Sequence, residues 1–217
     1  YNHNTYFTDC YNVKIKNTIF TRPSSIGNKF TAQDGEHSSY NIEIDNNLYV
    51  DGEIGISIGG NDRRFYRFAN IDIEGNVFTE IGRGDNTGRG ISWPVTIEDW
   101  DNGNFTDNYV LFNSLGMSNA YGIRFMRSGR HINLNDNIVY DINGQALEIT
   151  EDDVPGSSEY ASDISIFDNI FYEINPVSNL VNVRDANYLN SVSFSDNNYY
   201  AGTDFNHFRV EGNVLGF

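Results

Sequence analysis

Residues 44–49 read IDNNLY, and this pattern of an apolar residue, two variable residues, Asn, a variable residue and an apolar or aromatic residue returns along the whole chain. The copies are IKNTIF at Ile15, IDNNLY at Ile44, IEGNVF at Ile73, FTDNYV at Phe105, LNDNIV at Leu134, IFDNIF at Ile166 and FSDNNY at Phe194. Their fourth positions are Thr18, Asn47, Asn76, Asn108, Asn137, Asn169 and Asn197. These positions are 28 to 32 residues apart, and a period in this range indicates a stacked repeat architecture.

Each repeat contains two stretches in which every second residue is apolar, as expected for strands with one buried face. The first stretch leads into the repeated phrase, and the second follows ten to sixteen residues later. The second stretches read GNKF at Gly27, GISI at Gly55, GISW at Gly90, GIRF at Gly122, ALEI at Ala146, LVNV at Leu180 and HFRV at His207. The connecting segments are rich in Gly, Asn, Asp, Ser and Pro, which favour turns. No helical period appears, so the sequence predicts an all-β protein.

A coil of about thirty residues that adds one parallel strand to each sheet per turn is a β-helix, with neighbouring coils about 4.8 Å apart. The sequence therefore predicts a single parallel β-helix (solenoid) of about seven coils over residues 1–217. One inward column should contain Ile15, Ile44, Ile73, Phe105, Leu134, Ile166 and Phe194. A second should contain Phe20, Tyr49, Phe78, Val110, Val139, Phe171 and Tyr199. We expect the repeated Asn residues to form an inward ladder of hydrogen-bonded amides.

The chain of 217 residues is 39% apolar and 14% aromatic, with a formal net charge of −16. This apolar content suffices for one extended core and excludes a disordered chain. The negative charge argues against nucleic acid and anionic membranes as partners, and the chain has no run of 18 apolar residues. Cys10 is the single cysteine, which excludes an intrachain disulfide. The first residues, YNHNTYFTDC, read like part of an earlier repeat, so we expect a segment of a longer protein.

The motif IxIxxNxF, repeated over nearly all of the chain, resembles that of the pectate-lyase-like superfamily of right-handed parallel β-helices. The resemblance implies a right-handed coil and a secreted or envelope-associated protein. Most members of the superfamily cleave polysaccharides, and others are phage tailspikes and adhesins. The function implied by the resemblance is that of an extracellular polysaccharide lyase, which cleaves an acidic polysaccharide by β-elimination. We expect no required cofactor, although Ca²⁺ is compatible with the sequence.

The stretch NNLYVDGEIGISIGGN from Asn46 is similar to a phrase of the alginate and chondroitin lyase family, which reads NNLF…GE…IS. In that family a Lys follows the IS strand and an Arg-His pair lies on the next coil. This chain has Gly59 and Gly60 after the strand and GISWPV from Gly90 on the next coil. The catalytic residues of that family are therefore not carried over.

The outward positions of the second strands form a candidate groove for an extended polymer. Read along the stack, they are Lys29, Ser57, Ser92, Arg124, Glu148, Asn182 and Arg209. A lyase needs a base for the proton next to the uronate carboxylate and a positive group that stabilises the enolate. We assign these catalytic roles to Arg124, Arg127, His131 and Glu148, which lie on neighbouring coils. The residues expected to bind substrate are Lys29, Asp99, Trp100, Asp152 and Arg184.

The two tryptophans receive different predictions. Trp93 aligns with an inward position and is expected in the core. Trp100 flanks the acidic loop that ends in Asp101, and an exposed indole can stack on a sugar ring. We therefore expect Trp100 to be the sugar platform.

Other interpretations of the charged residues stay open. A glycoside hydrolase needs two carboxylates about 5 to 9.5 Å apart, and Glu148 or Asp152 with Asp99 would form such a pair. A non-catalytic β-helix would bind glycans or serve as a structural or adhesive spacer. Opposite charges on neighbouring coils would otherwise form exposed cross-strand ion pairs of little energetic weight.

Calcium is compatible with the sequence, but no metal ligand is assigned. Asp51, Glu53, Glu80 and Asp85 lie in loops of adjacent coils, and Ca²⁺ binds several carboxylate oxygens. A solvated acidic edge explains the same residues. The four histidines lack the spacing of zinc ligands.

Overall fold

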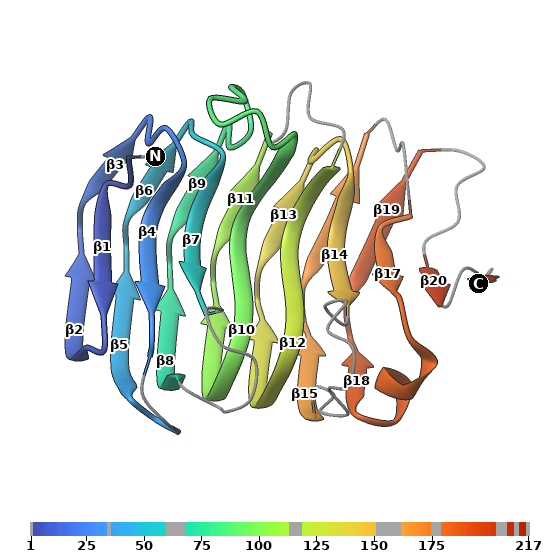
Figure 1. The fold of residues 1–217 in the computed structure, drawn as a ribbon. Coiled ribbons are helices and arrows are strands. Elements are labelled where there is room, and N and C mark those ends of the chain that lie inside the picture. Colours follow the sequence, from blue (N-terminus) through green and yellow to red (C-terminus); the bar gives the residue numbers. More distant parts are fainter. Residues whose placement is uncertain are drawn as a thin grey trace.

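The computed structural model describes residues 2–33, 36–59, 68–112, 119–150, 162–174, 179–202, 208–210 and 213–215. Only the backbone is described for residues 119, 127, 128, 186, 187 and 213–215. The chain winds through coils that stack along one axis, so strands from successive repeats lie side by side (Figure 1). The strand pairs are parallel except for the last, β20 with β21. The structure confirms the predicted all-β parallel β-helix.

Each coil contributes strands to three faces of the solenoid. The first face contains β2 (Tyr11–Lys16), β5 (Ser39–Asp45), β8 (Phe68–Glu74), the second halves of β10 (Ile91–Thr106) and β12 (Asn119–Asn135), β15 (Ser162–Phe167) and β18 (Val192–Ser195). The second face contains β3 (Ile19–Thr21), β6 (Leu48–Val50), β9 (Val77–Thr79), β11 (Tyr109–Leu111), β13 (Ile138–Tyr140), β16 (Ile170–Glu173) and β19 (Asn198–Ala201). The third face contains β1 (Thr5–Thr8), β4 (Ile26–Thr31), β7 (Ile54–Ile58), the first halves of β10 and β12, β14 (Gln145–Thr150), β17 (Val181–Val183), β20 (Phe208–Val210) and β21 (Asn213–Leu215).

The second face is a sheet of seven strands, one from each sequence repeat. Its five inner strands therefore pair with a neighbour on both sides. The other two faces are one sheet of 14 strands, because β10 and β12 each run from the third face into the first face of the next coil. In the described residues the only helix is a 3-10 turn, η1 (Ala186–Asn190), and none is long and apolar enough to span a membrane.

The coils turn at residues in the left-handed backbone conformation. The residue before the repeated Asn has a φ of 51° at Asn46, 55° at Asp107 and 57° at Asp136. Asn, Asp and Gly adopt this conformation at the lowest cost. The polar residue before the repeated Asn is therefore explained by the bend between the first and second faces.

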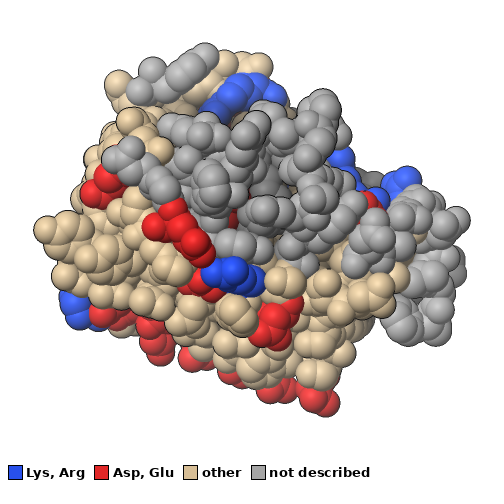
Figure 2. All heavy atoms as spheres, turned by 60° about the horizontal axis from the view of Figure 1, so that its bottom comes forward, with Lys and Arg blue, Asp and Glu red and all other residues tan. Residues whose placement is uncertain are grey.

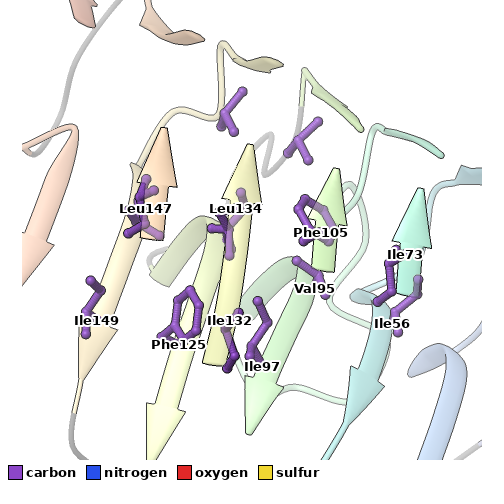
Figure 3. Close-up of a cluster of buried hydrophobic side chains, with 14 of the residues drawn as sticks. Ile56, Ile73, Val95, Ile97, Phe105, Phe125, Ile132, Leu134, Leu147 and Ile149 are labelled. Carbon is purple, nitrogen blue, oxygen red and sulfur yellow. The ribbon is translucent and has the colours of Figure 1, made fainter. Parts of the chain in front are cut away.

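The two predicted inward columns form the core, as the close-up in Figure 3 illustrates for the first of them. Ile73, Phe105 and Leu134 occupy neighbouring coils and have no exposed surface. In the second column the rings of Tyr49 and Phe78 stack with their centroids 4.8 Å apart. Burial of each such side chain contributes about 1.5–3 kcal/mol, so stacking coils is what makes any one coil stable.

The repeated Asn residues form the predicted inward ladder at the turn between the first and second faces. The backbone N and the Nδ2 of Asn76 donate to Oδ1 of Asn108, at 2.9 and 3.0 Å. Nδ2 of Asn108 in turn donates to the carbonyl of Ile73, at 2.9 Å, and to Oδ1 of Asn137, at 3.2 Å. The same bonds recur along the chain to Asn197. Each amide thus joins its own coil to the next.

The prediction of the outward column on the third face is wrong in the third coil. Thr96 occupies the column there, in register with Ser57 on one side and Arg124 on the other. Ser92, the predicted member, is buried and donates its Oγ to the carbonyl of Ile81 at 3.0 Å. Two apolar alternations, GISW and PVTI, overlap in this stretch, and the strand pairing selects the second.

Replacing Asn108 by Ala tests the ladder. The change removes the acceptor of two donors on Asn76 and the donor to the carbonyl of Ile73. Since each buried polar group left unpaired costs about 1–3 kcal/mol, we expect the unfolding free energy in urea denaturation to fall by at least about 3 kcal/mol. Asn198→Ala, at an exposed position, should change it by less than about 0.5 kcal/mol. Equal losses for the two variants would contradict the role of the ladder.

Candidate functional site

An arginine cluster lies on the outer side of the third face. Arg124 in β12 pairs in register with Glu148 in β14, Glu148 with Asn182 in β17, and Asn182 with Arg209 in β20. Arg184 follows directly after β17. The inward residues between them belong to the core, so these side chains project outward. The predicted column is confirmed in these four coils.

Glu148 is the centre of the cluster and has no exposed surface. One carboxylate oxygen accepts a bond from Nε of Arg124 at 2.6 Å, and the other accepts a bond from Nε of Arg184 at 2.7 Å. A buried carboxylate requires such pairing, because an isolated charge loses its hydration. Glu148 therefore holds the two guanidinium groups in fixed positions.

Arg124 is further held by two aromatic rings. Its guanidinium carbon lies 5.0 Å from the ring centroid of Trp93 and 4.7 Å from that of Tyr121, within the range of cation–π contacts. The Tyr121 hydroxyl accepts a long bond from Arg184, at 3.5 Å. Burial, and then the charge of Glu148, raise the pKa of Tyr121 above its usual value. The phenol is therefore neutral at physiological pH.

A hollow of about 290 Å³ opens beside the cluster and is lined by Gln145, Asn182, Arg184 and Arg209. The Arg184 side chain is 51% exposed, and Arg209 is also exposed. Arginine presents planar groups of N–H donors that match carboxylate and sulfate oxygens. Neither Gln145 nor Tyr121 was predicted from the sequence, since only the register of β12 and β14 places them beside the arginines.

The charge of this cluster is opposite to that of the whole chain. Arg124 and Arg184 bind one carboxylate, and Arg209 lies further along the same outward column, whereas the protein has a formal net charge of −16. On the face shown in Figure 2, acidic side chains recur along one edge and basic side chains are fewer. The chain thus concentrates positive charge locally on the third face, as a site for an anion requires.

The structure separates His131 from Arg124 and Glu148, the two other predicted catalytic residues whose side chains are described. His131 lies in the part of β12 that belongs to the first face, in register next to Asn102, and it is exposed. Its Nδ1 is 3.0 Å from Oδ1 of Asp101. The structure therefore brings together Arg124 and Glu148, with Arg184, but not His131.

Asp101 is the centre of a second charged cluster, at the start of the first face. Its carboxylate accepts a bond from Arg130 at 2.7 Å and lies 2.8 Å from Nε2 of His37. Arg130 also contacts Glu36, at 3.1 Å. The bonds from Arg130, His131 and His37 hold the pKa of Asp101 well below its usual range. Among the described residues, Glu36, His37 and Asp101 are the only group of acidic, His or Cys side chains close enough to share a metal ion, but Arg130 already supplies a cation there.

The remaining predicted residues are dispersed. Lys29 belongs to the outward column, three strands from Arg124, and donates to Ser57 at 3.0 Å and to the carbonyl of Gly59 at 3.2 Å. Asp99 is 1% exposed. Asp152 lies outside the described residues, as does the side chain of Arg127.

The prediction of Trp100 as an exposed sugar platform is wrong. Trp100 has no exposed surface, and its indole N–H donates to the carbonyl of Ile58 at 3.0 Å. β10 continues through this position into the first face, so Trp100 points into the core. Trp93 is buried, as predicted, but in a smaller cluster with Ile54 and Tyr121.

The acidic residues considered for calcium mostly have protein partners. Glu53 is fully buried and accepts bonds from Arg89, at 2.6 Å, and from the Thr87 hydroxyl, at 2.7 Å. Glu80 pairs with Arg83 at 2.7 Å. The structure thus favours a structural role for Glu53, because its carboxylate is satisfied without an ion.

No protein-family model matches the chain, and no curated protein matches it. Among solved structures, the A-module of the Azotobacter vinelandii mannuronan C-5 epimerase AlgE4 matches with a TM-score of 0.44 and 13% sequence identity. The match covers 92% of this chain and 64% of that module.

Glu148→Gln tests whether the arginine cluster depends on the buried carboxylate. The variant leaves two guanidinium groups without their counter-charge, and breaking a buried pair in this way is strongly destabilising. We expect the free energy of unfolding to fall by about 3 kcal/mol. Arg209→Ala, which does not contact Glu148 in the described structure, should change it by no more than about 0.5 kcal/mol. A fully stable Glu148→Gln protein would contradict the assignment.

Asp101 makes a separate prediction about acid unfolding. Its pKa is depressed in the folded protein, so its bonds add stability above the ordinary value of 3.8, and this contribution is lost as the pH falls through the lower folded value. Urea denaturation from neutral pH to below pH 4 should show that Asp101→Asn is less stable at neutral pH and loses less stability on acidification. Asp168→Asn, at an exposed position away from this cluster, should follow the wild type. Parallel curves for Asp101→Asn and the wild type would contradict the prediction.

Proposed function

We propose that this protein is carbohydrate-active and binds an acidic polysaccharide on the outer side of the third face, around Arg184 and Arg209. One observation carries the proposal: the buried carboxylate of Glu148 fixes two guanidinium groups beside a hollow whose lining contains no acidic residue among the described side chains. A row of outward side chains repeats about every 4.8 Å along the stack. A polymer lying along this row would place one charged group near Arg184 and another near Arg209, which lies on the next coil.

An acidic polymer fits the lining better than a neutral one. Arg184 and Arg209 offer several N–H donors each, and charge-assisted bonds to carboxylate or sulfate are stronger than bonds to neutral oxygens. Asn182 and Gln145 add neutral donors and acceptors for hydroxyl groups. Since the rest of the chain is acidic, the arginines would also determine where a polyanion approaches.

β-Elimination is the reaction that this arrangement would assist best. The proton to be removed lies next to a uronate carboxylate, and a guanidinium group on that carboxylate stabilises the enolate that forms. Arg184 is the exposed group of the cluster and takes this role in the proposal. Tyr121, whose raised pKa keeps its phenol neutral, would donate a proton to the departing sugar oxygen. The base that takes the proton next to the carboxylate is not among the described side chains that line the hollow, so in the proposal Arg184 stabilises the enolate and a group outside this lining removes the proton.

Hydrolysis by paired carboxylates is less well supported. Glu148 is buried between two arginines and Asp99 is 1% exposed, so neither offers the accessible carboxylate that a glycoside hydrolase needs. A purely binding or adhesive β-helix would use the same arginines without turnover. The proposal includes secretion, which is expected from the resemblance to the superfamily. It also includes a contribution from Ca²⁺, which is expected from the acidic loops.

Arg209→Ala tests the binding site without disturbing Glu148. We expect the Kd for a uronate oligosaccharide, measured by isothermal titration calorimetry, to rise about tenfold, because one charge-assisted bond is lost. Arg83→Ala is the matched control, since Arg83 is 59% exposed and pairs with Glu80 away from the cluster. Equal effects of the two variants, or no binding of any acidic polymer by the wild type, would contradict the proposal.

The reaction is tested on the same polymers. A β-eliminase would produce ultraviolet-absorbing unsaturated ends and new reducing ends in equal amounts. Reducing ends alone would contradict β-elimination and support hydrolysis, and binding without either product would support a binding module.

A further inference from the structure

The first face carries a second asparagine ladder on its outer surface. Nδ2 of Asn41 donates to Oδ1 of Asn12 at 2.9 Å, Nδ2 of Asn70 to Asn41 at 3.0 Å, and Nδ2 of Asn102 to Asn70 at 2.8 Å. All four residues are exposed. They lie six residues before the positions Thr18, Asn47, Asn76 and Asn108 of the inward ladder.

The left-handed backbone conformation explains why Asn is favoured at these four positions. It does not explain why their side-chain amides form a row that faces solvent. The four residues have φ values of 53°, 54°, 54° and 63°, in the left-handed region where Asn is well tolerated. The next two coils place His131 and Asp163 in the same conformation, with φ values of 55° and 54°. Other side chains are therefore accepted at this corner, and the amide row is confined to the first four coils.

Each amide in the outer ladder retains hydrogen-bonding capacity. An Asn side chain has two N–H donors and an oxygen with two lone pairs. A bond to each neighbour uses one donor and one lone pair, so an inner rung such as Asn41 or Asn70 keeps one of each. The row thus presents paired donors and acceptors repeated about every 4.8 Å.

A hollow of about 420 Å³ lies against this row and is lined also by Lys14, Glu43, Asp72 and Asn104. Asp72 is half-buried in it, and partial burial, followed by the charge of Asp45, raises the pKa of its carboxyl group. A carboxylate can accept bonds from two neighbouring hydroxyl groups at once. The hollow therefore combines a carboxylate acceptor with a line of amides.

We propose that this surface binds an uncharged saccharide chain, which lies along the helix axis across β2, β5, β8 and the second half of β10. Hydroxyl groups, which are both donors and acceptors, match the paired capacity of the amides. The proposal stands independently of the proposed function, because the arginine cluster lies on another face.

The charges around the hollow disfavour an acidic ligand. Lys14 is already paired with Glu43 at 2.8 Å, and Lys16 with Asp45 at 2.5 Å. Asp72 adds a further negative charge within the hollow. A polyanion would thus meet neutralised lysines and the negative charge of Asp72, whereas a neutral sugar would avoid this cost.

The test uses the double variant Asn41→Gly, Asn70→Gly. Glycine keeps the left-handed backbone and removes the amides. The probes are soluble oligosaccharides of glucose, xylose, mannose and galactose, titrated by calorimetry. We expect at least one to bind the wild type and its Kd to rise about tenfold or more in the variant, since two bonds of about 0.5–1.5 kcal/mol are lost.

The control is Asn17→Gly, Asn46→Gly, which changes two exposed residues of the same backbone class, with φ values of 53° and 51°, at the other end of β2 and β5. This control variant should bind the neutral oligosaccharide with the same Kd as the wild type, and so should Arg209→Ala. If no neutral oligosaccharide binds, or if affinity survives in the Asn41→Gly, Asn70→Gly variant, the proposal is wrong. Loss of acidic-polymer binding in Arg209→Ala with neutral binding retained would show that the two surfaces are separate.

Discussion

The inward asparagine ladder is the interaction on which the rest of this structure depends. Each buried amide joins its own turn to the next coil through directional hydrogen bonds, whereas apolar contacts have no preferred direction. A slip of one residue would turn every inward side chain of a strand to the outside. The ladder and the apolar columns therefore support each other: the columns provide most of the stabilisation, and the amides determine which residues face in and which face out.

Fixed register is also what creates the arginine cluster. Arg124, Glu148 and Arg184 are separated by 24 and 36 residues in the chain, yet the strand pairing places their side chains in contact. Because Glu148 is fully buried, its two arginines are held by a charge that substrate cannot reach. The same principle gives the first face its exposed amide row. Two outer surfaces of one solenoid thus acquire different chemistry, positive on one face and neutral to acidic on the other.

The sequence predicted the fold well because the repeat encodes it directly. The period of two, the spacing of the Asn residues and the apolar columns each point to the same coil, and the structure agrees. The errors arose where two patterns overlap. In the stretch from Gly90 to Trp100, apolar residues alternate in both GISW and PVTI, so the sequence does not show which of the two lies in the column. The strand β10 then continues through the expected loop and buries Trp100.

The candidate site was harder to predict, because contacts between outward side chains leave no periodic signal. Arg124 and Glu148 were predicted from their place in the outward column. The contact of Tyr121 with Arg124 and the position of His131 on another face depend on the length of β12, which the sequence did not predict. The most direct measurement is a titration of the folded protein with a uronate oligosaccharide, followed through the arginine Nε–Hε signals in NMR spectra. The account predicts that the signals of Arg184 and Arg209 shift while that of Arg83 does not. Unchanged signals at Arg184 and Arg209 in the presence of a bound polymer would contradict it.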